Sequence, residues 1–451
     1  MRYRFLARSP DKGYLDRDLW LPKKLVSQRG IKSRLTFKVF EGKSKKDFDY
    51  IYNYRESKHH LLVPRNFMSI EEVRDRYGVE VEDVRLTSFP KANVIHNIIP
   101  RDYQEAPLKL LDEMREKNRD GTLNLGCGLG KTVIALKHAA ESGVPTLVIC
   151  ANASILRNWK TEMETRLRFR GEVGWIQGPT FNWEDCSLAL AMVATLFNRK
   201  DELTAEFLMH WGLIIYDEGH HMSATTFAQT ANLFHGRRLA LTATPNRNDG
   251  LEPIYQSHLG DVFYRDTQTD LKPVCVFIHL SGYKDRAPRR CNDDNTFLQT
   301  WLSKDETYLH KAASILKTYV KDGRKVIALS HRVLLLEELV RVVPGAKGIW
   351  GSVNLEEREE ALLTGNPVMG SMTIAREGLN RPELDTLVGL TLVGNWNDFV
   401  QTAGRVLRDH NNKKYPIVAF LVPDIGKCQK QAGRLRGFAR RKGWKIREER
   451  G

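Results

Sequence analysis

The chain has 451 residues, a length typical of about three domains of roughly 150 residues each. Its 41% hydrophobic and 28% charged residues supply enough apolar material for buried sheets and exclude a collagen, a disulfide-rich miniprotein or a mainly disordered chain. No apolar run approaches the ~20 residues of a membrane span, and the first residues lack the apolar stretch of a signal peptide. The six cysteines include no CxxC pair, so neither a zinc site nor a disulfide framework is indicated. We therefore expect a soluble protein of the reducing cytoplasm.

The net charge of +15 is concentrated at the two ends of the chain. Residues 1–50 contain 14 basic and 6 acidic residues, and residues 424–451 contain 10 and 3, so the stretch 51–423 carries no net charge. Because clustered Lys and Arg side chains neutralise phosphates, this distribution predicts a catalytic body flanked by two phosphate-binding extensions. A solvated end is the alternative interpretation for either of them.

Residues 1–95 predict a small domain that contains β-strands. Leu35, Phe37 and Val39 alternate with more polar residues, and the aromatic side chains of 48–54 repeat the same two-residue period. This pattern predicts a hairpin with one apolar face, a basic opposite face and a basic tip. The residues expected to contact nucleic-acid phosphates are Arg34, Lys38, Lys43, Lys45 and Lys46.

From about residue 97 the chain changes to short, continuously apolar strands that alternate with helices, the pattern of a parallel sheet covered on both sides. The fold class is therefore α/β, with two tandem parallel-sheet lobes after the β-containing N-terminal domain. The segment 282–304 is poorly periodic and is expected to be a loop or insertion. The expected strands are 146–150, 212–216 and 238–242 in the first lobe and 325–330, 371–375, 387–392 and 417–422 in the second.

The polar segment 265–273 is the expected linker between the lobes. The expected domains are the basic N-terminal domain at 1–95, the first lobe at 96–268, the second lobe at 269–425 and a basic tail at 426–451.

The segment LNLGCGLGKT (123–132) follows a predicted strand and opens a predicted helix, the setting of a phosphate-binding loop. Backbone N–H groups of such a turn form an anion cradle, in which Lys131 reaches the β- and γ-phosphates of ATP and the Thr132 hydroxyl binds Mg²⁺. A glycine-rich turn without a nucleotide is the alternative.

The loop departs from the usual GxxxxGK(S/T) pattern at one position, because Leu125 stands where the first glycine is expected. Gly126 and Gly128 then have to supply the turn, and Gly130 precedes the lysine.

Two adjacent acids follow the next predicted strand in YDEGHH (216–221). At the carboxyl edge of a parallel sheet, Asp217 can hold Mg²⁺, and Glu218 can orient and deprotonate the attacking water. The alternative is that the two acids only cap a helix. The phosphate loop upstream favours the catalytic interpretation. Metal binding by His220 and His221 is a weaker hypothesis, because adjacent histidines point apart and no third ligand is evident.

Two further segments complete the predicted chemistry. LTATP (241–245) ends a strand, and its hydroxyls are expected to link the nucleotide edge to an interdomain cleft. QTAGRVLR (401–408) places Gln401, Arg405 and Arg408 on one side of a helix. Such arginines can donate to the γ-phosphate, a contribution of roughly 10³–10⁵ in rate. A salt-bridging surface helix is the alternative.

In this order the motifs resemble those of superfamily two helicases. RDYQ (101–104) resembles the adenine-reading motif, and LGCGLGKT, DEGH, TATP, TIAREGLN (373–380) and QTAGRVLR resemble motifs one, two, three, five and six. The segment CANAS (150–154) departs from the family's motif Ia, which commonly has a proline after this strand.

The resemblance implies two RecA-like lobes, with ATP and Mg²⁺ as cofactors and nucleic acid as partner. It implies that Gln104 reads the adenine edge, that Gly378 and Asn380 lie near the ribose, and that Thr373 lies near the nucleic-acid backbone. The residues expected to couple the nucleotide state to lobe movement are His220, Thr242, Thr244 and Gln401.

The motif sequences DEGH and TATP are similar to those of DNA translocases. The size and the basic ends resemble those of phage branch-migration helicases of the UvsW-like group. This resemblance implies a monomeric ATP-dependent DNA helicase that unwinds or branch-migrates forks and Holliday junctions, in the cytoplasm of a phage host. The alternatives are an RNA helicase, a translocase on double-stranded DNA that does not unwind it, and a catalytically silent nucleic-acid-binding protein.

Overall fold

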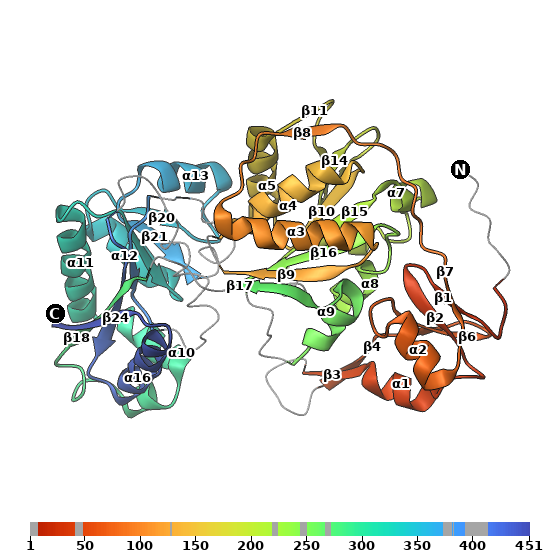
Figure 1. The fold of residues 1–451 in the computed structure, drawn as a ribbon. Helices are drawn as coiled ribbons and strands as arrows, with labels where there is room; N and C mark the ends of the chain where they lie inside the picture. The colour runs from red at the N-terminus through yellow and green to blue at the C-terminus, as the bar shows by residue number, and fades with distance from the viewer. Residues whose placement is uncertain are drawn as a thin grey trace. The chain divides into compact units, whose positions relative to one another are not determined.

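The fold is described from a computed structural model (Figure 1). The described residues are 8–40, 48–126, 129–218, 224–243, 250–266, 272–372, 381, 383–392 and 414–451. Contacts divide the chain into two compact units: the first consists of 1–125 and 130–267, and the second of 126–129 and 268–451.

The first unit begins with a small domain around a five-stranded sheet of order β5-β6-β2-β1-β7. Leu19, Leu21, Leu61 and Val63 are buried in its core together with Ile31. The helix α2 starts at a capping box, in which the Ser69 hydroxyl accepts from the Glu72 amide, and ends at Gly78 in the left-handed region. The elements are β1 (Gly13–Leu15), β2 (Asp18–Pro22), α1 (Gln28–Arg34), β5 (Arg55–Glu56), β6 (His60–Pro64), α2 (Ile70–Tyr77) and β7 (Val81–Asp83).

The predicted hairpin is present as β3 (Thr36–Phe40) and β4 (Phe48–Tyr52), and its faces differ from the expectation. Arg34 does not share a strand face with Lys38, because it is the last residue of α1 and its guanidinium lies 4.5 Å over the Phe67 ring. Lys38 pairs directly with Tyr50, so the tyrosines share the exposed face with the lysine. The tip residues Lys43, Lys45 and Lys46 lie outside the described residues.

Lobe one, the rest of the first unit, is built on an eight-stranded sheet of order β13-β12-β14-β10-β15-β16-β9-β17. All neighbouring strands are parallel except β12 and β13. The helices α3, α4 and α5 cover one face of the sheet, and α8 and α9 cover the other (Figure 1), with α6 in contact with α8. The central strands β10 and β15 are fully buried and mostly apolar, as a sheet covered on both faces requires.

The strands of lobe one are β8 (Val94–His96), β9 (Gly121–Leu125), β10 (Thr146–Cys150), β11 (Leu167–Phe169), β12 (Gly174–Gln177), β13 (Thr180–Asn182), β14 (Leu188–Met192), β15 (Leu213–Asp217), β16 (Arg237–Thr242) and β17 (Val262–Asp266). Its helices are α3 (Asp102–Glu116), α4 (Lys131–Ser142), α5 (Ala153–Arg166), α6 (Val193–Asn198), α7 (Ala205–His210), α8 (Ala224–Thr230) and α9 (Glu252–Leu259). β8 and β11 form a separate antiparallel pair.

A buried polar network joins the N-terminal domain to lobe one. Arg65 forms a bidentate ion pair with Asp120, with N···O distances of 2.5 and 2.6 Å and side chains 2% and 1% exposed. Asp120 also accepts from the amide of Asn66 and from the backbone N–H of Arg238, both at 2.8 Å. Burial raises the pKa of Asp120, but the charge and hydrogen bonds of Arg65 outweigh it and hold the pKa below its ordinary value. The two parts therefore form one packed body.

The second unit, lobe two, contains a seven-stranded parallel sheet of order β20-β21-β19-β22-β23-β18-β24. Its elements are β18 (Val274–Leu280), the 3₁₀ helix η2 (Arg289–Asn292), α10 (Asn295–Leu302), α11 (Glu306–Lys321), β19 (Val326–Ser330), α12 (Val333–Val342), β20 (Lys347–Ile349), α13 (Leu355–Thr364), β21 (Val368–Ser371), β22 (Thr386–Gly389), β23 (Ile417–Pro423), α16 (Gly426–Arg441) and β24 (Lys445–Arg450).

Three features of lobe two differ from the sequence-based expectations. The segment 282–304 contains η2 and α10, and α10 buries Leu298 and Leu302 in the lobe core. The strand expected at 371–375 begins earlier, at Val368, and is described to Ser371, whereas residues 373–375 lie outside the described ranges. Residues 426–451, expected as a basic tail, contain α16 and β24, and β24 pairs along β18 as the last strand of the sheet.

Candidate active site

Three adjacent parallel strands of lobe one end at the same edge of its sheet. β15 ends at Asp217, its neighbour β16 ends at Thr242, and β9 on the other side of β16 leads into the glycine-rich loop. The register pairs Asp217 with Leu241, and Thr242 with Asn124. The carboxyl edge of such a sheet is where ligands bind in doubly wound folds, so the topology brings the predicted motifs together.

The loop places a glycine at the position where the helix begins. Gly130 has a φ of 78° and is the residue before α4, which starts at Lys131. A Cβ atom at this position would lie 2.3 Å from the Nε2 atom of Gln104, so a side chain there would require Gln104 to move and would also strain the backbone. Gln104 is 4% exposed, and its Oε1 accepts from the Arg101 amide at 3.0 Å. The predicted adenine-reading residue therefore lies against the phosphate loop.

Lys131 and Glu218, which the sequence analysis assigns to the same reaction, face each other. The Lys131 Nζ lies 3.8 Å from Glu218 Oε1 and donates to the carbonyl oxygen of Leu125 at 3.1 Å. Glu218 has a φ of 48°, an uncommon value for a residue other than glycine, and its N–H donates to Leu241 at 3.0 Å. A strained residue held by a neighbouring strand is typical of functional sites, where the surrounding structure fixes the conformation.

Asp217 has a partner that the sequence analysis did not identify. The indole Nε1 of Trp159 donates to Asp217 Oδ2 at 2.7 Å, and the two residues are 1% and 8% exposed. Trp159 belongs to α5, where it is buried with Leu156 and Met163 at helical spacing. The helical spacing by itself indicates only that Trp159 is a core residue. Its indole N–H also makes it a hydrogen-bond donor to Asp217.

The donor set fits a magnesium ion. Thr132 is the second residue of α4, and Asp217 lies at the end of β15 with one oxygen engaged by the indole. Hydroxyl and carboxylate oxygens are the ligands that Mg²⁺ prefers, with phosphates and water completing its shell. When bound, the ion neutralises charge that develops on the phosphates. Within the described residues no group of three or more His, Cys, Asp and Glu side chains is arranged to hold a metal.

The described part of the glycine-rich loop includes Gly126, which is buried and whose carbonyl oxygen accepts from the Leu129 N–H at 3.3 Å. Several other predicted site residues lie outside the described residues. Besides Lys43, Lys45 and Lys46, the predicted residues outside the described ranges are Gly128, His220, His221, Thr244, Thr373, Gly378, Asn380, Gln401, Arg405 and Arg408. Their roles stay predictions.

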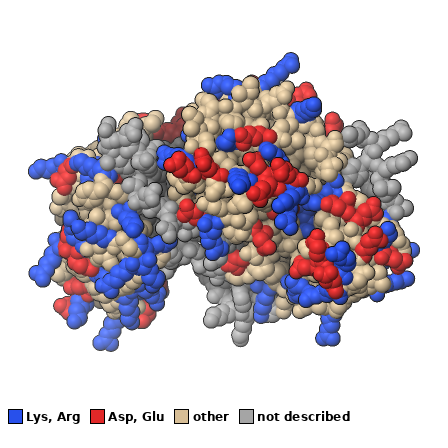
Figure 2. Space-filling model, in the orientation of Figure 1, with Lys and Arg blue, Asp and Glu red and all other residues tan. Residues whose placement is uncertain are grey.

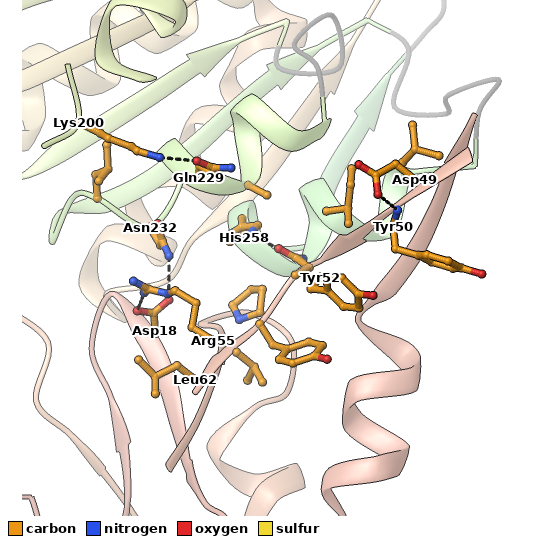
Figure 3. A pocket seen from close by; sticks show the side chains of 18 of the residues that line it. Asp18, Asp49, Tyr50, Tyr52, Arg55, Leu62, Lys200, Gln229, Asn232 and His258 are labelled. Atoms are coloured by element: carbon orange, nitrogen blue, oxygen red, sulfur yellow. Dashed lines mark hydrogen bonds and ion pairs between the residues drawn. The ribbon is translucent and has the colours of Figure 1, made fainter. Parts of the chain in front are cut away.

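A hollow of about 610 Å³ lies away from this edge, between β4 and lobe one (Figure 3). Its polar groups are engaged with one another: Asp18 accepts from Arg55 and from Asn232, and Lys200 donates to Gln229 at 2.6 Å. No residue of the predicted motifs lines it. The hollow is therefore a feature of the joint between the N-terminal domain and lobe one.

Comparisons with known proteins agree with the motif order. The family model described as "Type III restriction enzyme, res subunit" matches residues 97–247. The protein named "Probable helicase D10" of Escherichia phage T5 is 29% identical over 336 residues, which cover 71% of each chain. The DNA 3'-5' helicase XPB of Mycobacterium tuberculosis is 27% identical over 330 residues, 68% of this chain and 58% of its own length.

A solved structure shares the fold at low sequence identity. A fragment described as an HsdR subunit of a type I restriction enzyme from Vibrio vulnificus superimposes with a TM-score of 0.57 at 15% identity, covering 79% of this chain and 69% of that one. Phage T4 UvsW aligns with 94% of this chain and 95% of its own at 14% identity, with a TM-score of 0.36.

The motif order resembles that of superfamily two helicases, and the family model and the two relatives support this class for the chain. These findings support an enzyme that uses ATP as helicases do. Among the described residues no helix is long and apolar enough to cross a membrane.

Proposed function

We propose that the protein is an ATP-dependent DNA helicase that unwinds or branch-migrates branched DNA, such as forks and Holliday junctions, in phage recombination, repair or replication. It acts as a monomer in the cytoplasm of the host cell, with Mg²⁺ bound beside ATP. The names of the phage and mycobacterial relatives, which are a helicase and a DNA helicase, support this proposal.

The observation that carries the proposal is that each unit has a basic segment built into its fold. The basic residues 8–40 belong to the domain that the Arg65–Asp120 pair fixes to lobe one, and the basic residues 426–450 form α16 and β24 of lobe two. In Figure 2, Lys and Arg side chains gather on the face of the second unit in the region of α16. A motor that moves along a polyanion needs such a surface on each of its moving parts.

The described site supports the first steps of ATP hydrolysis. The phosphates of ATP replace Glu218 as the partner of Lys131, because the lysine lies at the helix N-terminus where an anion is also stabilised by the backbone N–H groups. Glu218 is then released to accept a proton from the attacking water. Arg405 and Arg408 remain the proposed donors to the γ-phosphate.

The test measures ATP hydrolysis and strand separation on matched substrates: a fork, a Holliday junction, a tailed DNA duplex and an RNA duplex of the same length. We expect DNA to stimulate hydrolysis, and ATP to drive separation of the fork and the junction more efficiently than of the tailed duplex. The Lys131→Ala variant is the control for nucleotide-independent melting.

Two other outcomes would replace the proposal. Stimulation and unwinding by RNA but not DNA would favour the RNA helicase alternative. Hydrolysis stimulated by duplex DNA, with displacement of a bound block but no strand separation, would favour a translocase that does not unwind.

A further inference from the structure

The outer face of the β3–β4 hairpin exposes two aromatic rings. The register places Thr36 opposite Tyr52 and Lys38 opposite Tyr50, so these four side chains share one face. Tyr50 is 44% exposed and Tyr52 is 60% exposed. Large aromatic side chains side by side on a surface indicate a site of interaction rather than a packing requirement.

The inner face holds the hairpin against lobe one. Phe37, Val39 and Ile51 pack against the apolar core of that lobe. Directly after β4, Asn53 is buried, with its Nδ2 donating to Ser257 at 3.1 Å and its Oδ1 lying 2.8 Å from the His258 ring. The tyrosines therefore stand on a strand that is fixed at its back and at its end, and they lose little conformational freedom on binding a ligand.

The two rings are spaced for stacking. Their centroids are 6.4 Å apart, with an angle of 32° between the ring planes. Two rings at this separation can each offer a face to a base, and the spacing is close to twice the ~3.4 Å rise between stacked bases of one strand. On the far side, Tyr54 meets Tyr52 edge to face at 6.0 Å, so the row of rings ends there.

Lys38 adds a cation to this face, since it is exposed and lies directly across from Tyr50. Figure 3 shows the Tyr50 ring directed away from the hollow between β4 and lobe one. Tyr50 and Tyr52 are both among the residues that line this hollow, so the two exposed rings stand at its border.

We propose that Tyr50 and Tyr52 stack on the bases of single-stranded DNA while Lys38 contacts its backbone. The combination of an aromatic strand face with a cation is how single strands are bound without sequence preference, because every base has a π-face. This inference rests on the proposed function, in which unwinding or branch migration exposes single-stranded segments beside the first unit.

The test measures binding of a fluorescent oligothymidine of about 20 nucleotides to the full chain by anisotropy, together with an abasic strand of the same length and charge. Replacing both tyrosines by Ala should weaken binding of oligothymidine by about fivefold or more per stacked base lost. The loss should disappear with the abasic strand, and the slope of log affinity against log salt should stay unchanged, because stacking releases no counterions. Tyr→Phe at both positions should retain the parent affinity.

Tyr415→Ala is the matched control, because this tyrosine is 55% exposed on lobe two. Equal loss of binding for the abasic strand and oligothymidine, or a Tyr50/Tyr52 double variant that binds oligothymidine like the parent, overturns the stacking assignment. If that double variant keeps the parent's ATP hydrolysis and unwinding as well, only this inference fails. If the parent itself neither hydrolyses ATP with DNA nor separates strands, the proposed function fails independently of the tyrosines.

Discussion

At the scale of single residues, Lys131 Nζ and Glu218 Oε1 lie 3.8 Å apart, and we assign them different roles: the lysine binds phosphate and the glutamate is the base. Lys131→Ala removes the charge that binds the phosphates, so ATP affinity should fall strongly and hydrolysis with it. Glu218→Gln removes the base but keeps the size of the side chain, so Mg-ATP should still bind while turnover falls by roughly 10²–10⁴. Equilibrium binding of a fluorescent ATP analogue and steady-state hydrolysis separate the two effects. Near-normal turnover in either variant would contradict the assignment.

Trp159 is a positioning residue for Asp217, and its role can be separated from packing. Trp159→Phe removes the indole N–H and leaves a buried carboxylate oxygen of Asp217 without that donor. Such a loss costs about 1–3 kcal/mol, and here it would leave the Asp217 side chain less firmly oriented. We expect a weaker apparent affinity for Mg²⁺ and a lower turnover, measured by titrating the ion at saturating ATP.

Trp211→Phe is the control, because Trp211 is equally buried in lobe one and its indole nitrogen has no partner among the described residues. If both variants change the Mg²⁺ dependence alike, the effect comes from packing and not from the hydrogen bond to Asp217.

At the scale of the elements, the joint between the N-terminal domain and lobe one depends on Asp120. Asp120→Asn leaves the buried guanidinium of Arg65 without its counter-ion, which typically costs 3–5 kcal/mol. We expect a lower thermal midpoint and faster hydrogen exchange in β6 and at the start of β16. The surface pair of Arg341, which is exposed, and Glu338, which is half-buried, gives the comparison, because Glu338→Gln should change stability by less than about 1 kcal/mol. Equal effects of the two substitutions would remove the special role of the buried pair.

The buried His138 on α4 makes stability depend on pH. Burial, followed by the nearby charges of Arg237 and Arg115, lowers the pKa of His138 to about 3, whereas a histidine of the unfolded chain has a pKa of about 6.5. Between these values the unfolded state binds the proton and the folded state does not. Stability is therefore lost as the pH falls through this window, by up to ~1.4 kcal/mol per pH unit for this group.

His138→Gln removes this titration. The thermal midpoint of the variant should consequently fall less steeply than that of the parent between pH 6 and pH 4. His59→Gln, at an exposed position, controls for the loss of a histidine. Parallel curves for His138→Gln and the parent would show that His138 does not contribute.

Local patterns predict local structure well in this chain. The apolar strands of lobe one follow from continuous buried runs, and the start of α4 follows from the glycine-rich loop before it. The contact of Trp159 with Asp217 joins residues 58 positions apart, so no local pattern indicates it. The alternating pattern of 48–54 places the tyrosines of β4 on the apolar face of the hairpin. In the structure Tyr50 pairs with Lys38 on the outer face, and Ile51 packs on lobe one instead. Which face of the hairpin is buried depends on contact with lobe one, which the hairpin sequence alone does not specify.

At the scale of the whole molecule, the two basic ends of the sequence become folded elements in different units. The contribution of α16 can be tested at Lys430, Arg434 and Arg441, whose spacing of four and seven residues places them on one side of the helix. All three are exposed and form no ion pair within the part of the chain that the structure describes. They are therefore available to phosphates.

Each phosphate contact contributes about −0.9 to the slope of log affinity against log salt on duplex DNA. Replacing the three residues by Gln should therefore reduce the magnitude of the slope by up to about 2.7, with no change in sequence preference. Lys304, Lys317 and Lys321, which are exposed in the same unit, give a control variant with the same loss of charge. If the control flattens the slope as much as the α16 variant, the response comes from net charge. If neither variant changes the slope, the duplex does not contact this face of lobe two. A smaller slope for the α16 variant alone would assign the contact to that helix, because both variants lose three positive charges from the same unit.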